Sequence, residues 1–128
     1  MLANANLNQQ NRKEIAPEKV LEQIQSSLDE NKAEDLVVID LEGRSSLADY
    51  MVIGSGRSST HVNALTDHVE RQLKKIKAPV YSVSGKSNGD WVLVDAGDVI
   101  VHLFRPEVRE FYQLEKMWQQ DFDQLAEA

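Results

Sequence analysis

Apolar residues recur at helical spacing in three stretches of the chain. The first stretch follows Pro17, a residue that suits the first turn of a helix, and stops near Asn31. In the second, Ser58 and the two hydroxyl residues after it offer N-cap oxygens, and Pro79 ends the periodic pattern. The third opens at Pro106. The pattern therefore predicts three helices, and the last presents an apolar face of Val108, Phe111, Leu114, Trp118, Phe122 and Leu125.

Five short apolar runs, rich in β-branched residues, predict strands. They cover residues 36–39, 50–53, 80–83, 91–94 and 99–101. Short turns containing Gly43 and Gly97 join the first two and the last two runs, so each of these pairs should be antiparallel. The helix between the second and third runs should make a right-handed crossover that places parallel strands in the same sheet. The fold class is therefore α/β (α+β), with a mixed five-stranded sheet flanked by helices.

The two ends of the chain lack this patterning. The first fifteen residues are rich in Asn and Gln without an apolar period, which predicts a disordered tail at 1–15. One domain is expected over residues 16–120, followed by a C-terminal tail or helix end at 121–128. We find no stretch that suits a signal peptide or a membrane span, so we expect a cytoplasmic protein with no membrane partner.

The charge of the chain narrows the class of partner. Its 128 residues include 14 Lys and Arg against 21 Asp and Glu, a net charge of −7. This argues against DNA binding, because affinity for a phosphate backbone depends on positive charge. Residues 57–77 hold five basic and two acidic residues, whereas residues 84–128 hold nine acidic and four basic ones. The acidic part also carries Trp91 and Tyr112, a mixture typical of protein interfaces. A binding module with a basic protein partner is therefore favoured over an enzyme.

Residues that could carry catalysis are few. Residues 54–59, Gly-Ser-Gly-Arg-Ser-Ser, lie between a strand and a helix, where free N–H groups could hold a phosphate. A Gly-Ser before a helix also opens nucleotidyltransferase sites, but these need carboxylates that bind metal, and Asp67 and Glu70 lie well inside the helix. His61 and His68 stand about 10 Å apart on that helix, too far for one metal ion. We expect no cofactor and no metal, and all three histidines to be structural or surface groups.

Asp95 and Asp98 flank the tight turn between the last two predicted strands. Such acids often only fix the turn and face water. Two carboxylates on a rigid hairpin are also a docking point for Lys or Arg of a partner. Trp91, at the start of the same hairpin, fits either the core or a contact surface.

Two longer stretches carry the motifs of a known family. The first is ADYMVIGSG at residues 48–56, followed by SSTHV at 58–62. The second is DWVLVDAGDVIVH at 90–102, followed by REFYQLEKMW at 109–118. In this order and at this separation, they resemble the Iojap family, the ribosomal silencing factors, from about Pro17 to Trp118.

The resemblance implies a fold similar to a nucleotidyltransferase core without catalytic carboxylates. It also implies a non-enzymatic repressor that binds the large ribosomal subunit through its protein fourteen, a basic protein. Bound there, it would sterically block the small subunit and repress translation when nutrients are limited. A large-subunit assembly factor is one alternative, and a nucleotide-binding or nucleotidyl-transferring enzyme is another. Family members also include homodimers.

The resemblance further implies a contact surface on the hairpin and the last helix. Carried over position by position, it comprises Trp91, Asp95, Asp98, Arg109, Tyr112, Glu115 and Lys116. Asp49 and His102 lie in the same motifs, where we expect structural roles within the sheet.

Overall fold

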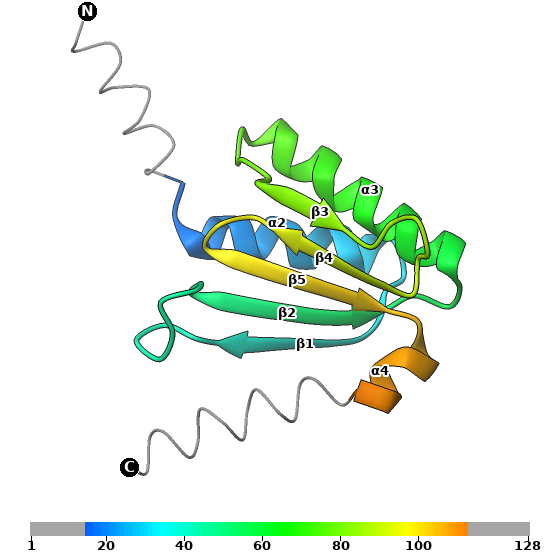
Figure 1. The fold of residues 1–128 in the computed structure, drawn as a ribbon. Coiled ribbons are helices and arrows are strands. Elements are labelled where there is room, and N and C mark those ends of the chain that lie inside the picture. Colours follow the sequence, from blue (N-terminus) through cyan, green and yellow to red (C-terminus); the bar gives the residue numbers. More distant parts are fainter. Residues whose placement is uncertain (1–14, 113–128) are drawn as a thin grey trace, which may run out of the picture.

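The computed structural model describes residues 15–112, which contain every element that the apolar pattern predicts (Figure 1). In chain order these are α2 (Pro17–Glu30), β1 (Glu34–Asp40), β2 (Tyr50–Ser55), α3 (Ser59–Lys75), β3 (Ser82–Ser84), β4 (Trp91–Asp95), β5 (Val99–Phe104) and α4 (Pro106–Tyr112). Most of both predicted tails and the rest of the last predicted helix lie outside the described residues. The domain boundaries therefore stay predictions.

The strands form one sheet in the order β1-β2-β5-β4-β3. Strands β2 and β5 pair in parallel, from Tyr50 opposite Val99 to Ser55 opposite Phe104. The other three neighbouring pairs are antiparallel. This confirms the mixed five-stranded sheet and both predicted antiparallel pairs. The strands on either side of α3 run parallel, as predicted, but β5 and β4 lie between them.

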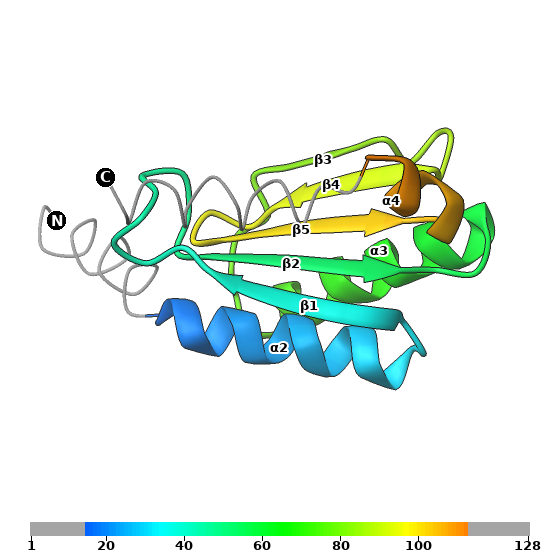
Figure 2. The same cartoon turned by 90° about the horizontal axis from the view of Figure 1, so that it is seen from below.

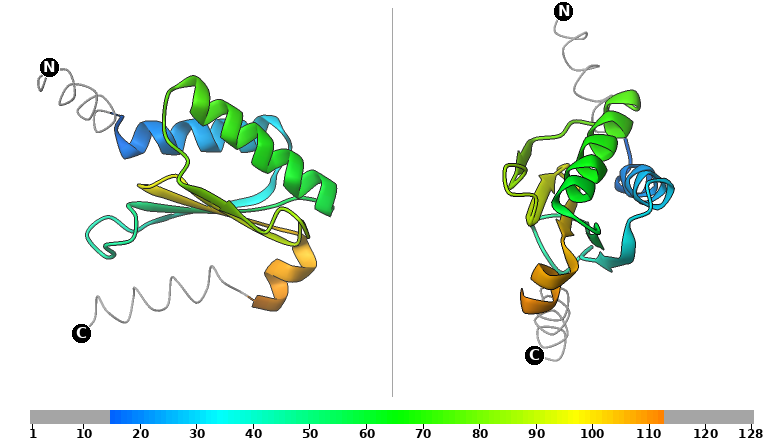
Figure 3. Two further views of the ribbon diagram at one scale, coloured as in Figure 1. Left: turned by 45° about the horizontal axis from the view of Figure 1, so that its top comes forward. Right: turned by 90° about the vertical axis from the view of Figure 1, so that its right-hand side faces the viewer.

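Helices α2 and α3 cover one face of the sheet, and α4 lies on the other side (Figure 3). The face of α2 at helical spacing buries Val20, Ile24 and Leu28. Helix α3 buries Val62, Leu65, Val69 and Leu73, and the strands add alternate residues such as Val52, Val92, Val94, Val99, Val101 and Leu103. Full burial of one such side chain contributes about 1.5–3 kcal/mol, so this layer is a major source of stability.

The opposite face of the sheet carries a second, smaller apolar cluster. It contains Met51 and Ile53 from β2 and Phe104 from β5, which alternate with residues of the first cluster. Helix α4 packs there through Val108. Figure 2 shows α4 at the end of the sheet where β5 terminates.

Both long helices end in the same hydrogen-bonded cap. After α2, the N–H groups of the two residues that follow Asn31 donate to carbonyls of the last turn, at 3.1 and 2.9 Å. After α3, the two residues that follow Ile76 do the same at 3.0 and 2.9 Å. In each cap the left-handed position, which usually holds glycine, is occupied by a lysine, with φ of 65° at Lys32 and 60° at Lys77.

Strand β3 begins two residues later than the apolar run at 80–83 predicts. Pairing with β4 starts where Ser82 lies opposite Asp95, and only three residues are involved. The preceding residue, Tyr81, is 67% exposed, although its N–H donates to the carbonyl of Asp95 at 2.8 Å. This edge strand is fixed by pairing with its neighbour rather than by burial, so apolar character does not locate it.

Candidate partner-binding site

The predicted contact residues Trp91 and Asp95 point to the same side of β4. The two valines between them belong to the cluster beneath the helices, and side chains alternate along a strand. Trp91 and Asp95 therefore face away from α2 and α3, about 13 Å apart at 3.3 Å per residue. We call the region of Asp95 and Asp98 the hairpin end of β4, and the region of Trp91 and Arg109 its α4 end.

The hairpin end presents its carboxylates on a fixed turn. An Oδ1 atom of Asp95 accepts a hydrogen bond from the N–H of Gly97 at 2.9 Å. The N–H of Ala96 donates to the carbonyl of Val99 at 3.0 Å, and Gly97 has a φ of 80°, which glycine adopts without strain. Asp98 follows and is exposed. Asp95 thus fixes the turn, as its sequence position predicts, while Asp98 remains exposed at the surface.

Further acidic residues gather around Asp98. Its backbone carbonyl accepts from the N–H groups of Asp49 (2.8 Å) and Tyr50 (3.1 Å), which joins the hairpin to the start of β2. Partial burial, and then the carboxylates of Asp49 and Glu18, raise the pKa of Asp98 above its usual value of 3.8. The Tyr50 hydroxyl donates to Glu18 at 3.3 Å. The hairpin end therefore carries the carboxylates of Asp49 and Glu18 in addition to those of the two predicted aspartates.

Sequence reasoning missed Glu18 entirely and expected only a structural role for Asp49. Glu18 lies in the first turn of α2, 80 positions before Asp98 in the numbering of the chain. Only the docking of α2 on the sheet brings it to the hairpin, so no local motif could have identified it. Asp49 is half-buried, and its backbone bond to the hairpin agrees with the predicted structural role.

At the α4 end, Trp91 is bonded into the second apolar cluster. Its Nε1–H donates to Nδ1 of His102 at 3.0 Å, and its ring lies 5.0 Å from that of Phe104 between centroids. Burial lowers the pKa of His102 to about 4. The imidazole is therefore neutral at pH 7, with its proton on Nε2, and His102 has the structural role predicted for it. Trp91 is half-buried, so it is partly core and keeps some surface for contact.

Arg109 is turned into the protein. It is 9% exposed, and its Nη1 donates to the Oγ of the buried Ser55, at the end of β2, at 2.9 Å. This bond fastens α4 to the sheet, which favours a positioning role over the direct contact that the resemblance implied. Of the other predicted contacts, Tyr112 ends α4, but its side chain, Glu115 and Lys116 lie outside the described residues.

Polar groups of the candidate phosphate-binding loop at 54–59 form hydrogen bonds within the protein. The N–H of Gly56 donates to the carbonyl of Phe104 at 2.9 Å, and that of Arg57 donates to Nδ1 of His61 at 2.9 Å. Ser58 caps α3 by accepting from the N–H of His61 at 3.1 Å. The geometry agrees with a capped strand-to-helix turn. The remaining ring nitrogen of His61, Nε2, lies 2.9 Å from a carbonyl at the end of α2, so this histidine ties the two helices together.

Residues 15–112 contain neither a cluster of metal ligands nor a membrane-spanning helix. No group of three or more His, Asp or Glu side chains lies close enough there to hold a metal ion. None of the helices in this range is long and apolar enough to cross a membrane. A nucleotidyltransferase-like core stays a prediction.

Comparison with known proteins decides the family. The model of the family described as "Ribosomal silencing factor during starvation" matches residues 13–127 of the chain. The chain belongs to the ribosomal silencing factor family. This confirms the resemblance carried by the motifs at 48–62 and 90–118. A family protein from Zymomonas mobilis is 48% identical over 108 residues, which are 84% of this chain and 81% of that protein.

Two other proteins extend this family relationship. A crystal structure from Chromobacterium violaceum is 33% identical, with a TM-score of 0.79, over 81% of this chain and 87% of that one. It shows that the family shares this fold. A mouse protein named "Mitochondrial assembly of ribosomal large subunit protein 1" is 38% identical over 112 residues, which are 84% of this chain and 49% of that protein. The relatives are thus named as silencing or assembly factors of the ribosome.

Proposed function

We propose that this protein binds the large ribosomal subunit through its protein fourteen and so keeps the small subunit from joining. It acts in the cytoplasm, represses translation when nutrients are limited, and catalyses no reaction. Membership of the ribosomal silencing factor family carries the proposal. The acidic hairpin end of β4 supports the choice of a basic protein as the partner.

The geometry of the hairpin end suits such a contact. Asp98 and Glu18 are exposed, while Asp95 and Asp49 are half-buried. Asp49 and Glu18 repel the carboxylate of Asp98, and this repulsion is relieved when Lys or Arg side chains approach, so a basic partner gains from a charge that the free protein holds at a cost. Trp91 provides apolar area on the same side of β4, at the other end of the strand, and aromatic residues are common binding hot spots.

Subunit joining tests this function directly. Purified protein should co-sediment with separated large subunits and not with small ones. When it is added before small subunits, it should reduce the yield of joined ribosomes in proportion to its occupancy. Normal joining at saturating protein would contradict the proposal.

A role in large-subunit assembly is a second candidate, favoured by the name of the mouse relative. Sedimentation profiles of cells separate the two. A joining inhibitor acts on mature free subunits, whereas an assembly factor co-migrates with immature particles and its loss causes them to accumulate.

A further inference from the structure

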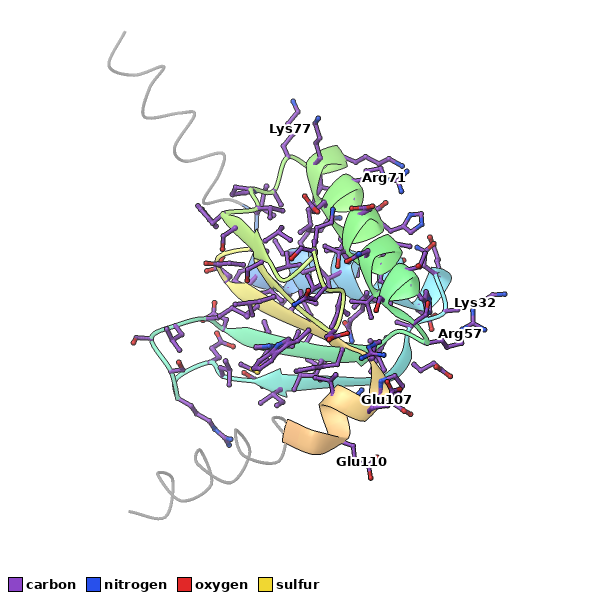
Figure 4. All side chains as sticks on the ribbon, turned by 45° about the vertical axis from the view of Figure 1, so that its right-hand side comes forward. Lys32, Arg57, Arg71, Lys77, Glu107 and Glu110 are labelled. Atoms are coloured by element: carbon purple, nitrogen blue, oxygen red, sulfur yellow. The ribbon has the colours of Figure 1, made fainter. Side chains whose placement is uncertain are left out.

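A cationic hollow lies at the C-terminal end of α3, outside the site described above. It is open, has a volume of about 520 Å³, and is lined by Glu70, Arg71, Lys74, Lys77, Ala78, Pro79 and Val80. Figure 4 shows Arg71 and Lys77 at this end of α3, with Lys32 and Arg57 at the other end. The protein has a net charge of −7, so the grouping of Arg71, Lys74 and Lys77 around one hollow is a local excess of positive charge.

The one acid in the lining is balanced by a neighbouring lysine. Lys86, from the loop before β4, lies with its Nζ 3.7 Å from a carboxylate oxygen of Glu70, and it also pairs with Asp67. Within residues 15–112, neither Lys74 nor Lys77 forms an ion pair with a carboxylate. The hollow therefore keeps a positive charge that the surrounding structure does not neutralise.

The end of a helix attracts cations, but this does not account for the cluster. The carbonyls at a helix C-terminus carry partial negative charge and favour Lys or Arg in the last turn. Helix α2 ends in the same cap with a lysine at the same position, yet its last turn holds Asp29 and Glu30 and no basic residue. Helix α3 instead ends in Lys74 and Lys75. The cap alone therefore does not demand the cations around the hollow.

The hollow adjoins the hairpin end of β4 through one exposed aromatic residue. Tyr81 follows Val80 of the lining, donates its N–H to the carbonyl of Asp95, and places its ring against Gly97 of the turn. Its side chain is 67% exposed. An exposed aromatic ring next to cations is the usual arrangement for contacting nucleic acid, because bases stack on the ring while the cations meet phosphates.

We propose that this hollow binds phosphate groups of ribosomal RNA, with Tyr81 stacking on an adjacent base or sugar. The inference rests on the proposed function and adds a second contact to it. An acidic hairpin beside a cationic hollow matches a surface on which a basic protein is surrounded by RNA. An acidic protein segment would also meet the cations, but it would leave the exposed ring of Tyr81 without a stacking partner.

The test compares two double variants of the full chain that change its charge equally. Lys74→Gln with Lys77→Gln removes two of the three cations of the hollow. The control is Lys19→Gln, at an exposed position of α2, with Lys32→Gln, at the exposed left-handed position after that helix. Affinity is measured for purified large subunits and for isolated protein fourteen over a range of salt. We expect the hollow variant to bind large subunits about tenfold more weakly at low salt, with the salt slope reduced by about one to two. Binding to isolated protein fourteen, and both affinities of the control, should not change.

Other results of these binding measurements would overturn either the inference or the proposed function. Equal binding of both variants to large subunits would overturn the inference and leave the proposed function standing, whereas failure of the unaltered protein to bind subunits would overturn the function itself. Direct binding of polyglutamate, and not of oligouridine, to the unaltered protein, if it is lost in the hollow variant, would assign the hollow to an acidic protein segment and overturn the inference. Lys77→Gly guards against misfolding, because glycine favours the φ of 60° at this position, so it should weaken subunit binding without loss of stability.

Discussion

The two ends of strand β4 differ in what their polar residues do. At the hairpin end, Asp98 stands exposed among other acids, and the pKa of its carboxyl is raised. At the α4 end, Trp91 is bonded to His102 and Arg109 to Ser55. Among the described residues, no cation forms an ion pair with the carboxylates of the first end, whereas the second end bonds its polar groups within the protein. Residues of one sequence motif can thus divide between exposed charge and internal support.

The largest effect should come from reversing the charge of the hairpin end. Asp95→Lys combined with Asp98→Lys should reduce binding to protein fourteen by at least about a hundredfold, since each interface anchor contributes on the order of 1–3 kcal/mol. The fold should persist, because the lost turn bond of Asp95 costs only about 1 kcal/mol. Pull-down and calorimetry measure the binding.

The matched control places the same charge change at the far end of α2. Asp29→Lys with Glu30→Lys alters two exposed acids in the last turn of that helix. This control should keep its affinity for protein fourteen. Binding by the hairpin variant at the level of the control would show that the partner docks elsewhere.

Removing the bond that fastens α4 should affect stability instead. Arg109→Met deletes the hydrogen bond to Ser55 and should lower the free energy of unfolding by about 1–3 kcal/mol. Urea unfolding measures the change, with Glu110→Gln at the neighbouring exposed position as the control. Unchanged stability together with lost partner binding would restore Arg109 as a direct contact.

A smaller effect is expected from Trp91→Phe. The substitution keeps an aromatic ring against Phe104 but removes the donor to His102, at a cost of about 0.5–1.5 kcal/mol. Because that bond favours the neutral imidazole, the pKa of His102 should rise from about 4. Titration followed by NMR measures it, and a pKa that does not move would mean that burial alone sets it.

The smallest effect on stability is expected from Asp98→Asn. The raised pKa means that ionised Asp98 opposes folding above that pKa, whereas the protonated form does not. The variant should therefore melt at most a few degrees higher at pH 7, and the gain should vanish as the pH falls below 3.8. For the unaltered protein, affinity for protein fourteen should weaken as the pH falls through the raised pKa. A Tm difference independent of pH would contradict this account.

How much the sequence predicts depends on whether the information is local. The helices and the central strands follow from periodic apolar residues, and the parallel course of β2 and β3 follows from the helix between them. The start of β3 does not follow from apolar periodicity, because Tyr81 and Ser82 are exposed at the edge of the sheet.

The candidate site shows the same limit. Asp95 and Asp98 lie three positions apart and are visible as a pair, whereas Glu18 reaches them only after α2 docks. The buried position of Arg109 was equally hidden, because its partner Ser55 lies 54 residues away along the chain. Contacts between distant segments decide which members of a motif remain at the surface.

The position of β5 between β2 and β4 has a consequence for how the protein forms. This strand, near the end of the described chain, joins two hairpins that share no other strand pairing. Until Val99 and the residues after it have been synthesised, the earlier strands have no central partner, and the long loop that β2 and β5 close makes their pairing slow. Folding is therefore completed late in synthesis, and the sheet should then form in a single cooperative step.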